Sequence, residues 1–328
     1  MSVEATDPAL AATGTQEAPA RRVNRSLAGR IVFCAVVAML CLLPFVMVLV
    51  ISFGEKIEGA GWVFGFDLTN YRRFFVGADW PNSTSFLYLQ KLGWSLNYAV
   101  IASVLAVVTA FPFTYFLTRL SRRAQTFWLV FLLSSLSLSE VFIVMGWDIL
   151  LSARSGLPMV MQETGLTDWL KDVGFFPTLR DWGLASPRNV KFKTSVLATV
   201  LTMSYLVWPY AVILLYPALS RLDPALIEAA RTMGARPWTV IRTVVIPSVK
   251  LALVGSVLLL FVFLLGTYVA VTVFAAPAQQ TLAVSIYESV RGSTLNAPFG
   301  AAQSVILLVT AVVLLAIGQK LSTAGGRA

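Results

Sequence analysis

The chain has 328 residues, of which 57% are apolar and 12% are charged, and its mean hydropathy is +0.77. Soluble domains carry about 45–50% apolar and about 25% charged residues, so this composition excludes a soluble enzyme, a nucleic-acid-binding protein and a disordered chain. Several runs of about 20 apolar residues are long enough to cross a bilayer as helices. The sequence therefore predicts an all-α, polytopic membrane protein.

The residue types present also restrict the chemistry of the chain. Histidine, the usual general base, metal ligand and proton relay near neutral pH, does not occur in the sequence. The two cysteines, Cys34 and Cys41, both fall in the first apolar run, which favours small packing residues over a disulfide or a thiolate metal site. We therefore expect no catalytic residue, no metal site and no cofactor.

The chain begins with a polar segment and then crosses the membrane repeatedly. Residues 1–20 are rich in alanine, threonine, proline and glutamate and lack an apolar period, and four arginines follow, so residues 1–30 are predicted to form a disordered tail. The apolar run at 31–52 is too long for a signal peptide and no small-residue cleavage site follows it, so we expect an uncleaved transmembrane helix. Five further runs predict six spans in all: 94–117, 126–151, 194–218, 251–274 and 303–320.

Lysine and arginine set the expected orientation. With the N-terminus inside, the inner segments carry fourteen of the 25 basic residues, whereas the eleven outside are spread over longer loops and offset by nine acids. Because basic residues resist translocation, both termini are predicted in the cytoplasm, the second as a short tail at 321–328. The net charge of +9 is then explained by lysine and arginine residues in the cytoplasmic loops, so no nucleic-acid partner is expected.

Two loops on the predicted outer side are long, at residues 53–93 and 152–193. Both contain glycine, proline and aromatic residues, which fits short helices on the outer membrane surface, with bounds that the sequence does not define. No internal repeat typical of inverted-repeat transporters is visible.

Two carboxylates, Glu140 and Asp148, fall in the third predicted span. Intramembrane carboxylates are energetically costly and usually face protein or a wet cavity. One interpretation is a path for a cation, to which Trp147, Phe142 and Tyr268 would add cation–π contacts. In the alternative, Glu140 is an interhelical hydrogen-bond residue and Asp148 lies at the membrane interface.

The loop between the fourth and fifth spans predicts two short helices. Asp223 is a suitable N-cap, and Pro224 suits the first helical position because no N–H is needed there. Gly234 can adopt the left-handed conformation that ends such a helix. Pro237 is predicted to start the second helix, and Pro247 to stop it just before the fifth span.

The first of these helices has small and apolar residues at helical spacing, and Glu228 and Arg231 point elsewhere. The predicted face consists of Leu222, Leu226, Ala229, Ala230 and Met233. Alanines leave little side chain, so a groove on a partner could approach the backbone closely. The alternative is an amphipathic helix lying along the headgroups, with Glu228 in a solvated i,i+3 pair with Arg231 worth about 0.2–0.5 kcal/mol.

The same loop carries a long motif. Glu228-Ala229-Ala230 is followed by Gly234 four residues later, and the segment ends in Val244-x-Ile246-Pro247. This spacing resembles the EAA motif of type I ATP-binding cassette (ABC) importer permeases. The stretch Leu68–Phe75 is similar to the same family, and Tyr216–Leu226 and Gly266–Tyr268 are most similar to its spermidine/putrescine-type members.

The resemblance covers most of residues 31–320 and implies an organisation. It implies a periplasmic loop at 53–93 and a permease core at 94–320, with a periplasmic insert at 152–193 and a cytoplasmic coupling loop at 219–250. By analogy, the residues that couple the pore to an ATPase are Leu226, Glu228, Ala229, Ala230, Met233, Gly234 and Pro247.

The resemblance also implies partners and a location. The chain has no Gly-x-x-x-x-Gly-Lys-Ser/Thr phosphate loop, so ATP would be hydrolysed by a separate pair of ABC ATPase subunits. We further expect a second permease subunit, preferably a different chain, and a periplasmic substrate-binding protein. The chain itself is expected to cross a bacterial inner membrane several times, in contact with its lipid. A small solute such as a polyamine would move by alternating access. The alternative function is a stand-alone secondary transporter or channel.

Overall fold

A computed structural model describes residues 25–57, 61–186, 189–292 and 295–324. The chain divides into two units, residues 1–47 and 48–328, which are considered separately. In the first unit the described residues belong to α1 (Arg25–Ser52), which begins earlier than the predicted span at 31. The rest of the predicted tail, residues 1–24, lies outside the described residues.

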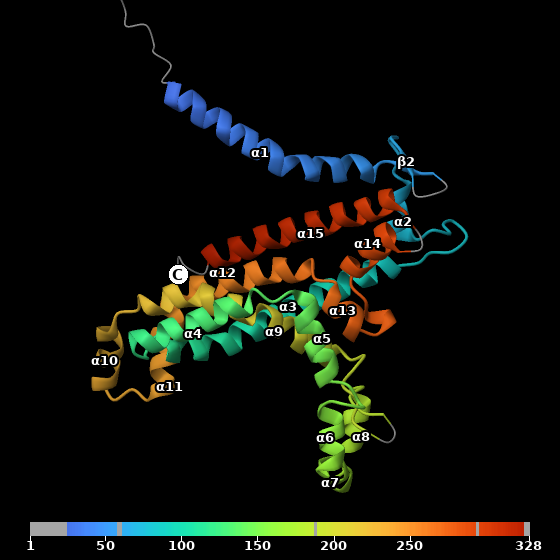
Figure 1. The fold of residues 1–328 in the computed structure, drawn as a ribbon. Helices are drawn as coiled ribbons and strands as arrows, with labels where there is room; N and C mark the ends of the chain where they lie inside the picture. Colours follow the sequence, from blue (N-terminus) through green and yellow to red (C-terminus); the bar gives the residue numbers. More distant parts are fainter. Residues whose placement is uncertain (1–24, 58–60, 187–188, 293–294, 325–328) are drawn as a thin grey trace, which may run out of the picture. The chain divides into compact units, whose positions relative to one another are not determined.

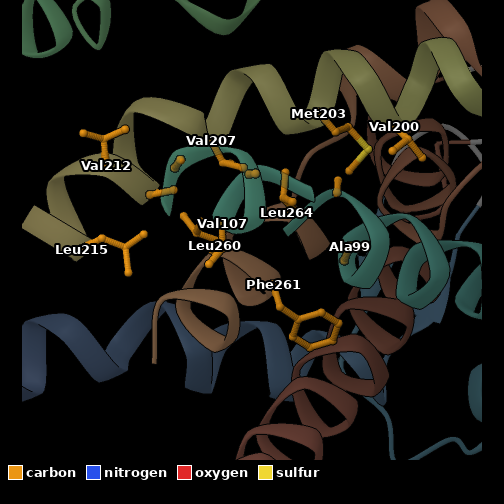
Figure 2. Packing of buried hydrophobic residues seen from close by; sticks show 14 of the residues in the cluster. Ala99, Val107, Val200, Met203, Val207, Val212, Leu215, Leu260, Phe261 and Leu264 are labelled. Carbon is orange, nitrogen blue, oxygen red and sulfur yellow. The ribbon is translucent and has the colours of Figure 1, made fainter. Parts of the chain in front are cut away.

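Three long apolar helices form the core of the second unit (Figure 1). They are α3 (Leu87–Leu117), α9 (Val196–Ser220) and α12 (Ile246–Leu265). Figure 2 shows side chains from all three, among them Val107, Val207 and Leu260, gathered between the ribbons. The core therefore lies among segments that are far apart in the sequence.

Small residues on α3 explain how closely these helices pack. The buried face of α3 includes Ala99, Ala102, Ser103, Ala106 and Ala110, which recur at helical spacing. Helices in lipid associate through such small residues, because lipid tails offer no hydrophobic advantage over packing. The hydroxyl of Ser204 on α9 donates a hydrogen bond to the Ala102 carbonyl oxygen of α3, at 3.2 Å.

Shorter elements and one further long helix complete this unit. The remaining elements around the core are β1 (Glu55–Lys56), β2 (Trp62–Val63), α2 (Thr69–Val76), α4 (Arg122–Ser135), α5 (Glu140–Leu150), α13 (Val269–Phe274), the 3-10 helix η2 (Pro277–Gln279), α14 (Leu282–Arg291) and α15 (Ala297–Ala324). The two strands pair antiparallel, with Glu55 opposite Val63. Phe74, Leu282 and Phe299 form a second buried cluster that joins α2, α14 and α15.

Within the described residues, five helices are long and apolar enough to cross a membrane, and there are up to six crossings if the bent pair α4–α5 counts as one span. The predicted spans at 94–117, 194–218 and 303–320 are confirmed as helices: α3 and α15 extend beyond the predicted bounds, and α9 begins and ends two residues later than predicted. The expectation of one continuous helix over 126–151 is wrong, because the chain bends by 93° between Ser135 and Glu140.

A serine-rich sequence explains this bend. The hydroxyls of Ser134 and Ser135 donate to the carbonyl oxygens three residues earlier, each at 2.7 Å, and so compete with the helical ladder. Ser139 then caps the new helix by accepting a hydrogen bond from the Val141 N–H at 3.4 Å. The break cannot be predicted from the hydropathy of the sequence, since the helices on both sides of it are apolar.

The fifth predicted span, 251–274, also differs from the structure. Its helix α12 ends at Leu265, and the separate helix α13 begins at Val269 after a break over Gly266–Tyr268. Helix α13 packs against α5 and α9. The predicted insert at 152–193 contains three short helices, α6 (Leu157–Glu163), α7 (Leu166–Asp172) and α8 (Phe176–Asp181).

Candidate functional site

The loop between α9 and α12 folds into the two predicted short helices, at the end of the bundle opposite α13 and α14 (Figure 1). They are α10 (Pro224–Thr232) and α11 (Pro237–Val240). Asp223 caps α10, since its Oδ1 accepts a hydrogen bond from the Ala225 N–H at 2.9 Å. Gly234 takes a positive φ of 82° and ends the helix. These local predictions are confirmed.

The prediction that five residues share one face of α10 is only partly correct. Ala230 turns inward together with Ile227, and both are buried where α10 packs against α11 and the following turn. Leu226, Ala229 and Met233 turn outward instead, and Met233 is 82% exposed. The sequence analysis missed Ile227, although its i,i+3 spacing to Ala230 was a usable signal.

We call the exposed set Leu226, Ala229 and Met233 the α10–α11 outer face. Its members are apolar and are spaced so that they lie on one side of α10. Glu228 lies exposed beside this face, and among the described residues no ion pair joins it to Arg231, so the pair expected under the alternative interpretation is absent. An exposed apolar surface with a charged residue at its edge is typical of an interaction site.

The expectation that Pro247 stops the second short helix is wrong. Helix α11 continues through a π-helical turn, η1 (Ile241–Val245), directly into α12. In this turn the Ile246 N–H donates to the Ile241 carbonyl, five residues earlier, so the ladder is already shifted before the proline. Pro247 therefore sits in the first turn of α12, where a missing N–H is tolerated.

The predicted path residues lie on α5 and near α13. Glu140 is the first residue of α5, directly after the bend, and its carboxylate lies near the backbone of Ala270 in α13. Its Oε1 is buried and has no hydrogen-bond partner among the described residues. A buried carboxylate oxygen without a partner is energetically costly.

Trp147 lies two turns further along α5, in an open groove of about 320 Å³. Its ring meets that of Tyr205 on α9 edge to face, with 5.6 Å between the ring centroids, and Phe142 also lines the groove. The sequence analysis missed Tyr205, because a partner on a distant helix leaves no local signal. The groove presents aromatic faces but does not include Glu140.

The structure separates the other two predicted path residues from this groove. Asp148 pairs with Lys193 at 2.7 Å, and the two side chains are 38% and 33% exposed. This ion pair favours the structural interpretation of Asp148. Tyr268 stacks on Tyr287 of α14, with ring centroids 4.7 Å apart. Among the described residues no group of three possible metal ligands lies together.

The sequence profile of the family described as "Binding-protein-dependent transport system inner membrane component" matches residues 122–323, which is more than half of the chain. The chain belongs to this family. It is a multi-pass inner-membrane permease subunit of a type I ABC importer, a transport component without an ATPase site of its own.

Two curated relatives and one solved structure give the comparison detail. The chain is 26% identical over 297 residues to the spermidine/putrescine transport system permease protein PotB of Salmonella typhimurium, covering 90% of this chain and 93% of the relative. PotB of Escherichia coli K12 is 25% identical over 84% of this chain and 90% of its own. A bacterial ABC transporter that imports the acidic polysaccharide alginate shares the fold, with a TM-score of 0.60 at 15% identity, over 91% of this chain and 96% of that one.

Proposed function

We propose that the α10–α11 outer face is the surface on which an ATPase subunit docks, and that it couples ATP hydrolysis to the pore. The observation that carries this proposal is the division of α10 into two faces. Ile227 and Ala230 are buried on one side of α10. On the other side of α10, Leu226, Ala229 and Met233 are exposed and available for contact with a partner.

The connection to the bundle supports this role. Helix α10 packs on α11 and η1, and the segment Pro237–Leu265 is helical throughout. A displacement of α10 would therefore reach α12 without passing through a flexible loop. Because α12 packs against α3 and α9, two ATPase subunits that move together could switch the whole bundle between two states.

Replacing Ala229 with tryptophan tests the docking surface. The added indole would occupy the gap left by the alanine, so we expect loss of most ATPase subunit from a pull-down and at least a tenfold drop in uptake. The matched control is Thr243→Trp, an exposed position of η1 outside the outer face, which should retain both. Equal retention of the ATPase by both variants would refute the assignment.

We further propose that the transported solute is a polyamine. Relatives named as spermidine/putrescine permeases align over nearly the whole chain, and a polyamine is a flexible cation. The buried Oε1 of Glu140 and the aromatic groove at Trp147 and Tyr205 both suit a cation, through charge and through cation–π contact. Asp148 is already neutralised by Lys193 and is left out of the path.

The same proposal includes further partners and an orientation. A second permease subunit, preferably a different chain, would complete the pore, and a periplasmic binding protein would deliver the solute to the outer loops. The basic residues of the α3–α4 and α10–η1 segments support a cytoplasmic position for that end of the bundle and for both termini. Co-purification from membranes, with the ratio of the two permeases measured, tests the composition.

A further inference from the structure

A second, larger groove runs along the outside of the bundle, between α3 and α12. It has a volume of about 540 Å³, and it is lined by α3 between Val107 and Phe116, by α12 between Ile246 and Leu258, and by Trp238 and Ile241. The α3 part alone is about 14 Å long at 1.5 Å per residue. That length matches one leaflet of a bilayer whose hydrocarbon core is about 30 Å thick.

One end of this α3–α12 groove is polar and basic. Arg119, one turn beyond the lining residue Tyr115, places its guanidinium 5.0 Å from the ring centroid and donates a hydrogen bond to the Tyr115 hydroxyl at 3.4 Å. Among the described residues no carboxylate pairs with Arg119. The exposed indole of Trp238 lies at the same end of the groove. Tryptophan is enriched at the membrane–water interface, so this end fits a position at that interface.

The surrounding segments add positive charge. Residues 118–123, from the end of α3 into α4, and residues 221–250, from the end of α9 into α12, hold two acids, Asp223 and Glu228, against a larger set of basic residues. These are Arg119, Arg122, Arg123, Arg221, Arg231, Arg236, Arg242 and Lys250. Basic residues near an anionic bilayer surface are attracted to it. The groove thus combines an apolar channel, long enough for one acyl chain, with positive charge at its Arg119 end, which we call the mouth of the groove.

We propose that the α3–α12 groove binds an anionic phospholipid, with one acyl chain along the groove and its phosphate at Arg119. A zwitterionic lipid fits the channel but gains less from the basic mouth, which would make the site selective for anionic headgroups. The bound lipid would contact α3, α11, η1 and α12 together, and so would join the coupling helices to the core. The proposal requires only that the chain spans a membrane, and it stands apart from the substrate assignment.

The headgroup contact is tested with the full-length chain in nanodiscs that contain phosphatidylcholine and phosphatidylglycerol. We expect native mass spectrometry to show retained phosphatidylglycerol on the wild-type chain and at least a fivefold loss in Arg119→Gln. The matched control is Arg154→Gln, an exposed arginine before α6 that does not line the groove, which should stay within twofold of wild type. Equal retention by Arg119→Gln and Arg154→Gln would overturn the proposal.

The acyl channel is tested separately by filling it. Val108→Trp, at an exposed lining position of α3, should abolish retention of phosphatidylglycerol, whereas Val104→Trp, one turn away and outside the groove, should preserve it. Phosphatidylglycerol with brominated acyl chains should quench the Trp238 fluorescence, measured as the difference from Trp238→Phe. Absence of that quenching would contradict lipid binding.

Discussion

Glu140 carries an ionisable carboxylate whose Oε1 is buried, which is an energetically costly combination. The sequence analysis could identify Glu140, because a carboxylate within an apolar run is conspicuous and costly. It could not predict that Glu140 begins a helix or that its Oε1 lies buried with no hydrogen-bond partner in the part of the chain that the structure describes, since both depend on α13 packing against α5. Lys193 was missed for the same reason, because it reaches Asp148 across the whole insert.

Glu140→Gln tests the path at the scale of one residue. The amide keeps the size of the side chain and removes its charge, so we expect uptake of radiolabelled spermidine to fall at least tenfold while the amount of assembled complex stays unchanged. Glu163→Gln, on an exposed position of α6, is the control and should transport normally. Unchanged uptake kinetics in Glu140→Gln would remove this residue from the path.

At the scale of elements, predictions succeeded where the signal is local. The N-cap Asp223, the helix start at Pro224 and the turn at Gly234 lie within a few residues of the structure that they define. The bend between α4 and α5 and the break before α13 were missed, because hydropathy is the same on both sides of each. The serine run before Glu140 was the available sign of the first break.

The end of α10 gives a prediction for one element. Gly234 has a φ of 82°, and a Cβ there would meet no neighbouring atom within 4 Å, so the cost of a side chain is conformational rather than steric. We expect Gly234→Val to destabilise this turn by about 1–2 kcal/mol and to lower uptake. Gly234→Asn should largely preserve uptake, because asparagine tolerates the left-handed conformation.

Thermal unfolding and uptake of the purified variants measure this effect. Gly255→Ala is a suitable control, because Gly255 lies on α12 in open space without a positive φ. If Gly234→Val and Gly255→Ala behaved alike, the left-handed turn would not determine the position of α10.

For the whole molecule, composition and the spacing of apolar runs were enough to predict the helical membrane fold. The motif in the loop after α9 was enough to indicate the family. What the sequence could not provide is the arrangement of α3, α9 and α12 in space, because their contacts join segments about 100 residues apart. The mouth of the α3–α12 groove is invisible in the sequence for the same reason.

Cross-linking from Met233 tests the coupling role of the α10–α11 outer face most directly. The native cysteines, Cys34 and Cys41, are first replaced by serine, and Met233→Cys is then compared with Thr243→Cys in membranes that contain the complete transporter. We predict a cross-link from position 233 to the ATPase subunit and none from 243. Absence of that cross-link, together with quenching of a probe at position 233 by brominated lipid, would show that α10 lies in the headgroups and would contradict the account.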